Sequence, residues 1–150
     1  LTWIILFKLQ MDFSNLRDMN YRSVNLIPFA GSGIVNDRVD VSEILLNVAA
    51  FVPFGIYVSM LKPDWGFWKK VLPIFCVSLF YEVMQYVLAI GGSDITDLIG
   101  NTLGGVAGIG VFAGLYRLFG KKIIKILNIL ALIGTVAAVA FLALLVIANL

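Results

Sequence analysis

The sequence predicts an all-α integral membrane protein, a bundle of about five transmembrane helices. Of its 150 residues, 61% are hydrophobic and only 13% are charged, which is far more apolar than a soluble domain. Its mean hydropathy is +0.99, and a soluble fold of this size could not hide so much apolar surface. The apolar residues also form runs long enough to cross a bilayer, which takes about 20 residues.

The chain begins with a short apolar stretch, LTWIILF, which we expect to be the end of a truncated first helix because it has fewer than half of the residues that a crossing needs. A long polar connection follows, from about residue 8 to residue 43. It contains RSVNLIPFAGSG, from Arg22 to Gly33, in which proline and glycine favour turns. We expect this long outer loop, between helices 1 and 2, to be ordered or re-entrant rather than helical.

Two apolar spans follow the loop. The second span runs from Ile44 to about Leu61 and is interrupted by Asn47 and Pro53. Proline is tolerated in a membrane helix where neighbouring groups satisfy the freed carbonyl, so we expect a kinked helix there. The third span runs from Val71 to Ile90.

The last two spans differ in their small residues. The fourth runs from about Asp94 to Phe119 and carries Gly100, Gly104 and Gly108 at intervals of four. This spacing predicts a face on which another helix packs closely. The fifth span, Ile123 to Ala148, is almost entirely apolar beyond Lys125 and Asn128, and we expect a peripheral helix that faces lipid.

Positive charges predict the orientation of the helices. Three lie in the connection between spans two and three and four in the connection between spans four and five. On the opposite side, Arg17, Arg22 and Arg38 are spread over the long loop and none lies in the short turn at Gly91–Gly92. By the positive-inside rule the two basic connections are cytoplasmic, so the long loop, the glycine turn and the C-terminus face outward. The seven residues are Lys62, Lys69, Lys70, Arg117, Lys121, Lys122 and Lys125.

Polar residues within or beside the apolar spans indicate a site. Glu82 and Gln85 are three residues apart, and Asp94, Asp97 and Asn101 have the spacing i, i+3, i+7, so each set predicts one helix face. Charges in membrane helices usually face the bundle interior or a water-filled cavity. We therefore expect an outward-facing polar pocket that binds a ligand and is formed by Arg22, Asn25, Glu82, Gln85, Asp94, Asp97 and Asn101.

The composition excludes several kinds of chemistry. The chain has no histidine and one cysteine, Cys76, in an apolar run where we expect inert packing. Histidine-dependent triads, zinc sites with histidine ligands and intrachain disulfides are excluded, and the sequence has no phosphate-loop motif. We expect no cofactor, although carboxylates could hold Mg²⁺ or Ca²⁺, and no nucleic-acid partner.

Four motifs in order carry a family resemblance: R-x-x-NLIPF at Arg22, N-x-x-x-FVPFG at Asn47, E-x-x-Q at Glu82 and D-x-x-D-x-x-x-NTLGG at Asp94. Together they resemble the VanZ-like family of teicoplanin-resistance membrane proteins. The resemblance implies a VanZ-like helical membrane domain at residues 1–120, with an additional C-terminal transmembrane helix at 121–150. It also implies a bacterial plasma-membrane protein associated with reduced susceptibility to lipoglycopeptide antibiotics.

Several functions remain open from the sequence. The pocket could bind a membrane lipid, a lipid-linked envelope component or the lipoglycopeptide itself. Alternatively, the protein could be an enzyme acting on a lipid-linked envelope substrate, with Glu82 or Asp97 as general base. A transporter with Glu82 as a proton relay is a third hypothesis, although the chain shows no internal repeat. The polar residues could also only join helices, through pairs such as Asn47 with Asn101. Whether the protein is an enzyme or an oligomer stays undecided.

Overall fold

The computed structural model describes residues 24–28, 34–35, 38–39, 41–88 and 93–148, with side chains from 24–28, 44–88 and 93–147. Four long helices make up most of this part: α2 (Val41–Leu61), α3 (Phe67–Leu88), α4 (Ile95–Phe119) and α5 (Lys122–Ala148). All four are long and apolar enough to cross a membrane. The predicted all-α membrane fold is confirmed, while the predicted first helix lies outside the described residues.

Short strands complete the described segments. They are β1 (Val24–Asn25), β2 (Ile34–Val35), β3 (Arg38–Val39) and β4 (Ser93–Asp94). Strand β1 pairs in parallel with β4, and β2 pairs antiparallel with β3. The register of the first pair sets Val24 opposite Ser93 and Asn25 opposite Asp94. The described part of the long loop before α2 is thus strand and turn rather than helix, and its backbone is tied to the residues that precede α4.

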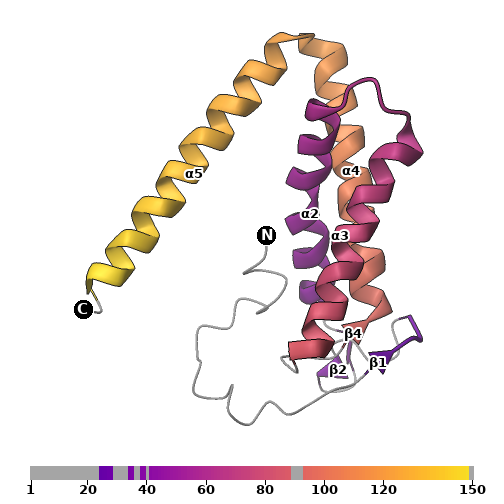
Figure 1. Ribbon diagram of the computed structural model, residues 1–150. Helices are drawn as coiled ribbons and strands as arrows, with labels where there is room; N and C mark the ends of the chain where they lie inside the picture. The colour runs from indigo at the N-terminus through magenta and orange to yellow at the C-terminus, as the bar shows by residue number, and fades with distance from the viewer. Residues whose placement is uncertain (1–23, 29–33, 36–37, 40, 89–92, 149–150) are drawn as a thin grey trace. The chain divides into compact units, whose positions relative to one another are not determined.

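The chain separates into two compact units, Leu1–Phe112 and Ala113–Leu150. In the first unit, α2, α3 and the first part of α4 lie side by side (Figure 1). The third helix begins at Phe67, earlier than the predicted start at Val71. The sequence predicts that Lys69 and Lys70 lie in a connection, but they lie in the first turn of α3 because a helix can extend beyond the hydrocarbon thickness.

Each helix of the first unit buries one stripe of side chains. In α3 the buried residues are Ile74, Ser78, Glu82 and Gln85, at intervals of four, four and three. In α2 the buried positions run through Asn47, Phe51, Gly55 and Val58 with the same spacing. These intervals put the members of each stripe on one helix face, so a helical period orders the interior of the unit.

Glycines of α4 lie directly against the backbone of α2. A Cβ atom added to Gly104 would overlap the carbonyl oxygen of Val48, and one added to Gly108 would overlap that of Val52. Gly55 of α2 lies equally close to the backbone of Gly105. Small residues permit such close approach between membrane helices, so the predicted glycine packing face is confirmed.

Polar and apolar side chains are distributed as a lipid environment requires. Among the described side chains, nine polar or charged residues are buried, against six hydrophobic ones, while many large apolar residues are exposed. In lipid an exposed leucine loses little, whereas an exposed charge is costly. The most apolar window of α5 has no buried residue at all. Cys76 of α3 is exposed as well, and that its thiol is inert stays a prediction.

Candidate functional site

Of the buried polar residues that the structure describes, all except Ser59 gather at one end of the three-helix unit. Asn47 lies near the beginning of α2, Glu82 and Gln85 near the end of α3, and Asp97 and Asn101 near the beginning of α4. Hydrogen bonds between the helices, given below, show that these three ends meet. We call this group the polar cluster: Asn25, Asn47, Ser78, Glu82, Gln85, Asp94, Thr96, Asp97 and Asn101.

Asp94 joins three parts of the polar cluster. Its Oδ1 accepts a hydrogen bond from the backbone N–H of Thr96 at 2.7 Å, and its Oδ2 accepts one from Asn25 Nδ2 at 3.1 Å. Its own backbone N–H donates to Glu82 Oε2 at 2.9 Å. The outer-loop strand, α3 and α4 are therefore held together at one residue.

This geometry corrects the prediction for Asp94. We expected it on one helical stripe with Asp97 and Asn101, but it lies in β4 and α4 begins one residue later. Its side chain instead caps the helix, because an N-cap carboxylate accepts a hydrogen bond from the second or third backbone N–H. Only Asp97 and Asn101, four residues apart, share the helix face.

Asp97 of α4 accepts a hydrogen bond from a side chain of α2. Its Oδ1 accepts a hydrogen bond from Asn47 Nδ2 at 2.6 Å, between residues that are both buried. The sequence had suggested Asn101 as the partner of Asn47, and it had left Asn47 out of the predicted site. The signal was present in the sequence, as an amide inside an apolar span.

For the other predicted site residues, the structure gives burial and helix face or does not describe them. Gln85 and Asn101 are buried, at 2% and 0% exposure, on the faces of α3 and α4 that carry Glu82 and Asp97. Arg22 lies outside the described residues. Sequence reasoning also missed Ser78, which is fully buried one helical turn from Glu82; its spacing of four from that carboxylate could have found it.

The carboxylates of the polar cluster accept hydrogen bonds from neighbouring side chains and backbone groups. Among the described residues, no three acidic, cysteine or histidine side chains lie close enough together to hold a metal ion. Two of the carboxylates accept hydrogen bonds from amide side chains, and two accept them from backbone N–H groups. The arrangement presents hydrogen-bonding oxygen and nitrogen atoms from three helices and two strands.

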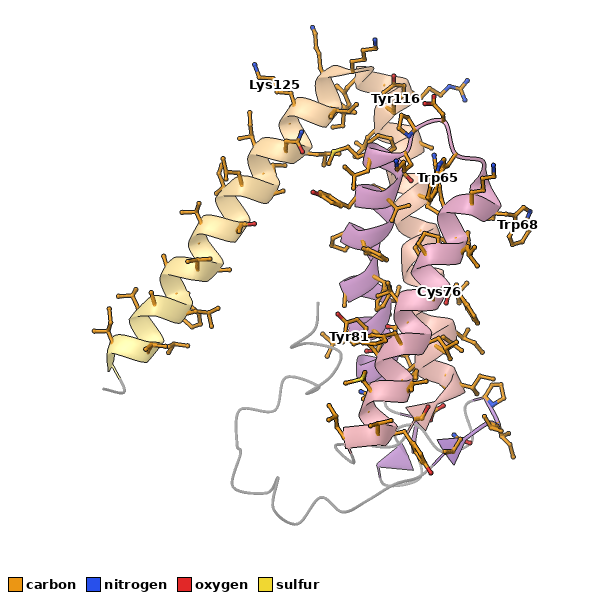
Figure 2. All side chains as sticks on the ribbon, in the orientation of Figure 1. Trp65, Trp68, Cys76, Tyr81, Tyr116 and Lys125 are labelled. Carbon is orange, nitrogen blue, oxygen red and sulfur yellow. The ribbon has the colours of Figure 1, made fainter. Side chains whose placement is uncertain are left out.

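The opposite ends of α2 and α3 carry exposed aromatic and basic side chains. Trp65 and Trp68 are exposed there, with Cys76 further along α3 (Figure 2). A shallow hollow of about 330 Å³ lies beside them and is lined by Trp65, Lys69, Leu72, Pro73 and Cys76. The lysine ammonium of Lys62 lies 5.7 Å from the Trp65 ring centre. Exposed tryptophans beside lysines are typical of a membrane interface.

The fold and the polar cluster define a multi-pass helical membrane protein with buried carboxylates at one end of its helices. The VanZ/LLP1 family profile matches residues 1–120, and the chain belongs to this family. It is 37% identical over 112 residues to Protein VanZ of Enterococcus faecium, an alignment that covers 75% of this chain. The chain spans 66% of the length of that relative. No solved structure matches the chain.

Proposed function

We propose that this protein reduces the susceptibility of a bacterial cell to lipoglycopeptide antibiotics such as teicoplanin. In this proposal the polar cluster binds the polar part of an amphiphile, either a lipid-linked envelope component or the drug. Membership of the VanZ/LLP1 family supports the resistance role. The observation that carries the binding role is the polar cluster itself, in which three buried carboxylates lie at one end of apolar helices.

Helix packing alone is a poor explanation for these carboxylates. Hydrogen bonds between membrane helices contribute on average below about 2 kcal/mol, and uncharged amides or hydroxyls can make them. Ionisable residues in membrane segments are costly and mark ligand or ion pathways. Glu82 and Asp97, each 3% exposed, therefore favour a site over a purely structural role.

The proposed site faces the cell exterior. Lys62, Lys69 and Lys70 lie at the opposite end of α2 and α3, and the positive-inside rule assigns that end to the cytoplasm. The polar cluster then lies on the side of the outer leaflet, where lipoglycopeptides and lipid-linked wall precursors reside. The C-terminus, one crossing after the basic α4–α5 connection, is also outside in this orientation.

The resistance role is tested by removing one charge. We express the protein and its Glu82→Gln variant in a teicoplanin-sensitive bacterium and measure the minimal inhibitory concentration. Glu82→Gln keeps the shape of the side chain, so we expect normal membrane levels with loss of most of the protection. Asp64→Asn, in the exposed α2–α3 connection, is the matched control. Full protection by Glu82→Gln at normal protein levels would contradict the proposal.

Binding and catalysis are separated by a second measurement. We compare the lipids and wall precursors of cells that carry the wild type and the Asp97→Asn variant. Binding predicts unchanged composition and direct association of the purified protein with teicoplanin or precursor. A new lipid-linked product that requires intact Asp97 would instead establish the enzyme hypothesis.

A further inference from the structure

Two buried side chains of the polar cluster have no hydrogen-bond partner in the part of the chain that the structure describes. They are Asn101 of α4 and Ser78 of α3, both at 0% exposure. For Asn101 this holds for both Nδ2 and Oδ1, and for Ser78 it holds for Oγ. By contrast, Asn47, the cluster residue on α2, donates a hydrogen bond to Asp97.

The two residues lie at the same level of the bundle. Two contacts show that helices α3 and α4 are antiparallel. Asp94, just before α4, contacts Glu82 near the end of α3, and Gly105, later in α4, lies against Ile74, earlier in α3. Ser78 lies four residues from Ile74, and Asn101 lies four residues from Gly105, both toward the polar cluster. Each step is about 6 Å along a helix, so the register brings Ser78 level with Asn101.

This level separates two chemically different layers. One turn outward are Glu82 and Asp97, which accept hydrogen bonds from other elements. One turn inward are Ile74 and the glycines at 104 and 105, which pack without polar side chains. A buried hydrogen-bonding group that stays unsatisfied costs about 1–3 kcal/mol, so three such atoms at one level point to a partner outside the part of the chain that the structure describes.

We infer that Ser78 and Asn101 form the floor of the proposed binding site and hydrogen-bond an uncharged, hydroxyl-bearing head group, such as a sugar ring. The inference rests on the proposed function and specifies the ligand chemistry. A carboxamide donates two hydrogen bonds and accepts others, and a serine hydroxyl does both. A sugar hydroxyl matches this set because it also donates and accepts.

An anionic head group fits this floor poorly. The carboxylates of Glu82 and Asp97 lie one helical turn away, and like charges in a buried setting repel strongly. The described basic residues of α3 and α4 are at the other ends of these helices: Lys69, Lys70 and Arg117. The floor therefore favours a sugar or glycerol hydroxyl over a phosphate.

The inference is tested with purified protein in phosphatidylcholine nanodiscs. Monoglucosyl diacylglycerol and phosphatidic acid with the same acyl chains are the two lipid probes, and teicoplanin and its sugar-free aglycone are the two drug probes. We expect a sugar-bearing probe to bind at least about tenfold more tightly than its sugar-free counterpart, as one or two added hydrogen bonds would give. If the lipid pair shows this difference, the sugar belongs to a lipid head group; if the teicoplanin pair shows it, the sugar belongs to the drug.

Asn101→Leu keeps the volume of the side chain and removes its hydrogen-bonding atoms. We expect it to abolish the preference for the sugar-bearing probe while the unfolding temperature stays equal or rises, because no internal hydrogen bond is lost. Ser78→Ala should weaken the preference in the same direction. Asn128→Leu, exposed on α5, and Ser59→Ala, buried without a partner at the other end of α2, are the matched controls.

Two results would overturn the inference. Equal binding of sugar-bearing and sugar-free probes by the wild type would show that the floor holds only water. A drop in unfolding temperature in Asn101→Leu would show that the carboxamide has a structural partner. In either case the Glu82→Gln susceptibility assay still reports separately on the proposed function.

Discussion

Asn47 donates a hydrogen bond of 2.6 Å to the carboxylate of Asp97 in the buried space between α2 and α4. The two residues are 50 positions apart in the chain, so this bond fixes how two helices meet. It lies on the same side of α4 as the glycines that touch the backbone of α2. Close backbone packing and one polar bond thus act on the same helix pair.

Removing the amide of Asn47 should destabilise the bundle. In Asn47→Leu the buried Asp97 carboxylate loses a donor, and leaving a buried acceptor unsatisfied costs about 1–3 kcal/mol, more when it is charged. We expect a lower unfolding temperature and a reduced free energy of unfolding in detergent. Asn47→Leu combined with Asp97→Leu should recover part of the loss, since no buried charge is then left behind. A single variant as stable as the wild type would show that the bond contributes nothing.

Glycine 104 provides a test of the close packing between α2 and α4. A Cβ at this position would overlap the Val48 carbonyl oxygen, so Gly104→Ala must push the helices apart. Overpacking of this kind typically costs about 1–3 kcal/mol. Gly110→Ala is the control, because open space surrounds that position and alanine favours a helix over glycine by up to about 1 kcal/mol. We expect thermal unfolding to show a loss for Gly104→Ala and no loss for Gly110→Ala.

The sequence was sufficient for the helices and insufficient for the way their ends are joined. Apolar run length placed α4 to within one residue, because hydrocarbon thickness sets the length of a span. The start of α3 was missed because Lys69 and Lys70 belong to a helical turn outside the apolar run. Pairing of β1 with β4 involves two residues on each side, and such short backbone pairing leaves no periodic pattern.

Site prediction had a similar limit. Periodicity found the faces that carry Glu82 and Asp97, since helical spacing is local. Periodicity could not distinguish an N-cap role for Asp94 from a place on the helical face, because the sequence at the start of α4 is the same in both cases. The partner of Asn47 was also beyond reach, because contacts between distant residues depend on how the helices are aligned.

Asp94 should matter for local order at the start of α4. Asp94→Ala removes the bond from the Thr96 N–H, and loss of an N-cap costs about 0.5–2 kcal/mol. It also removes the bond to Asn25, which ties the outer loop to the helices. We expect faster hydrogen exchange at the Thr96 amide in Asp94→Ala and near-normal exchange in Asp94→Asn, since asparagine is an equally good cap. Equal protection in the wild type and the alanine variant would contradict the capping role.

The orientation of the polar cluster can be measured by cysteine labelling in intact cells. Cys76→Ala removes the single native thiol, and because that side chain is exposed the change should alter stability by less than about 0.5 kcal/mol. Into this background we place one cysteine at Leu26, exposed beside the polar cluster, or at Asp64, exposed in the α2–α3 connection.

A membrane-impermeant maleimide should then label Leu26→Cys in intact cells and Asp64→Cys only after permeabilisation. The physical reason is the set of lysines at the α2–α3 end, since short basic connections stay in the cytoplasm. Asn128→Cys, in the apolar α5, serves as the control for labelling within the bilayer and should react poorly in both conditions. The reverse pattern for Leu26 and Asp64 would place the polar cluster against the cytoplasm. Glu82, Asp97 and Asn101 would then be out of reach of any amphiphile in the outer leaflet, and the proposed antibiotic-related binding would have no ligand on its side of the membrane.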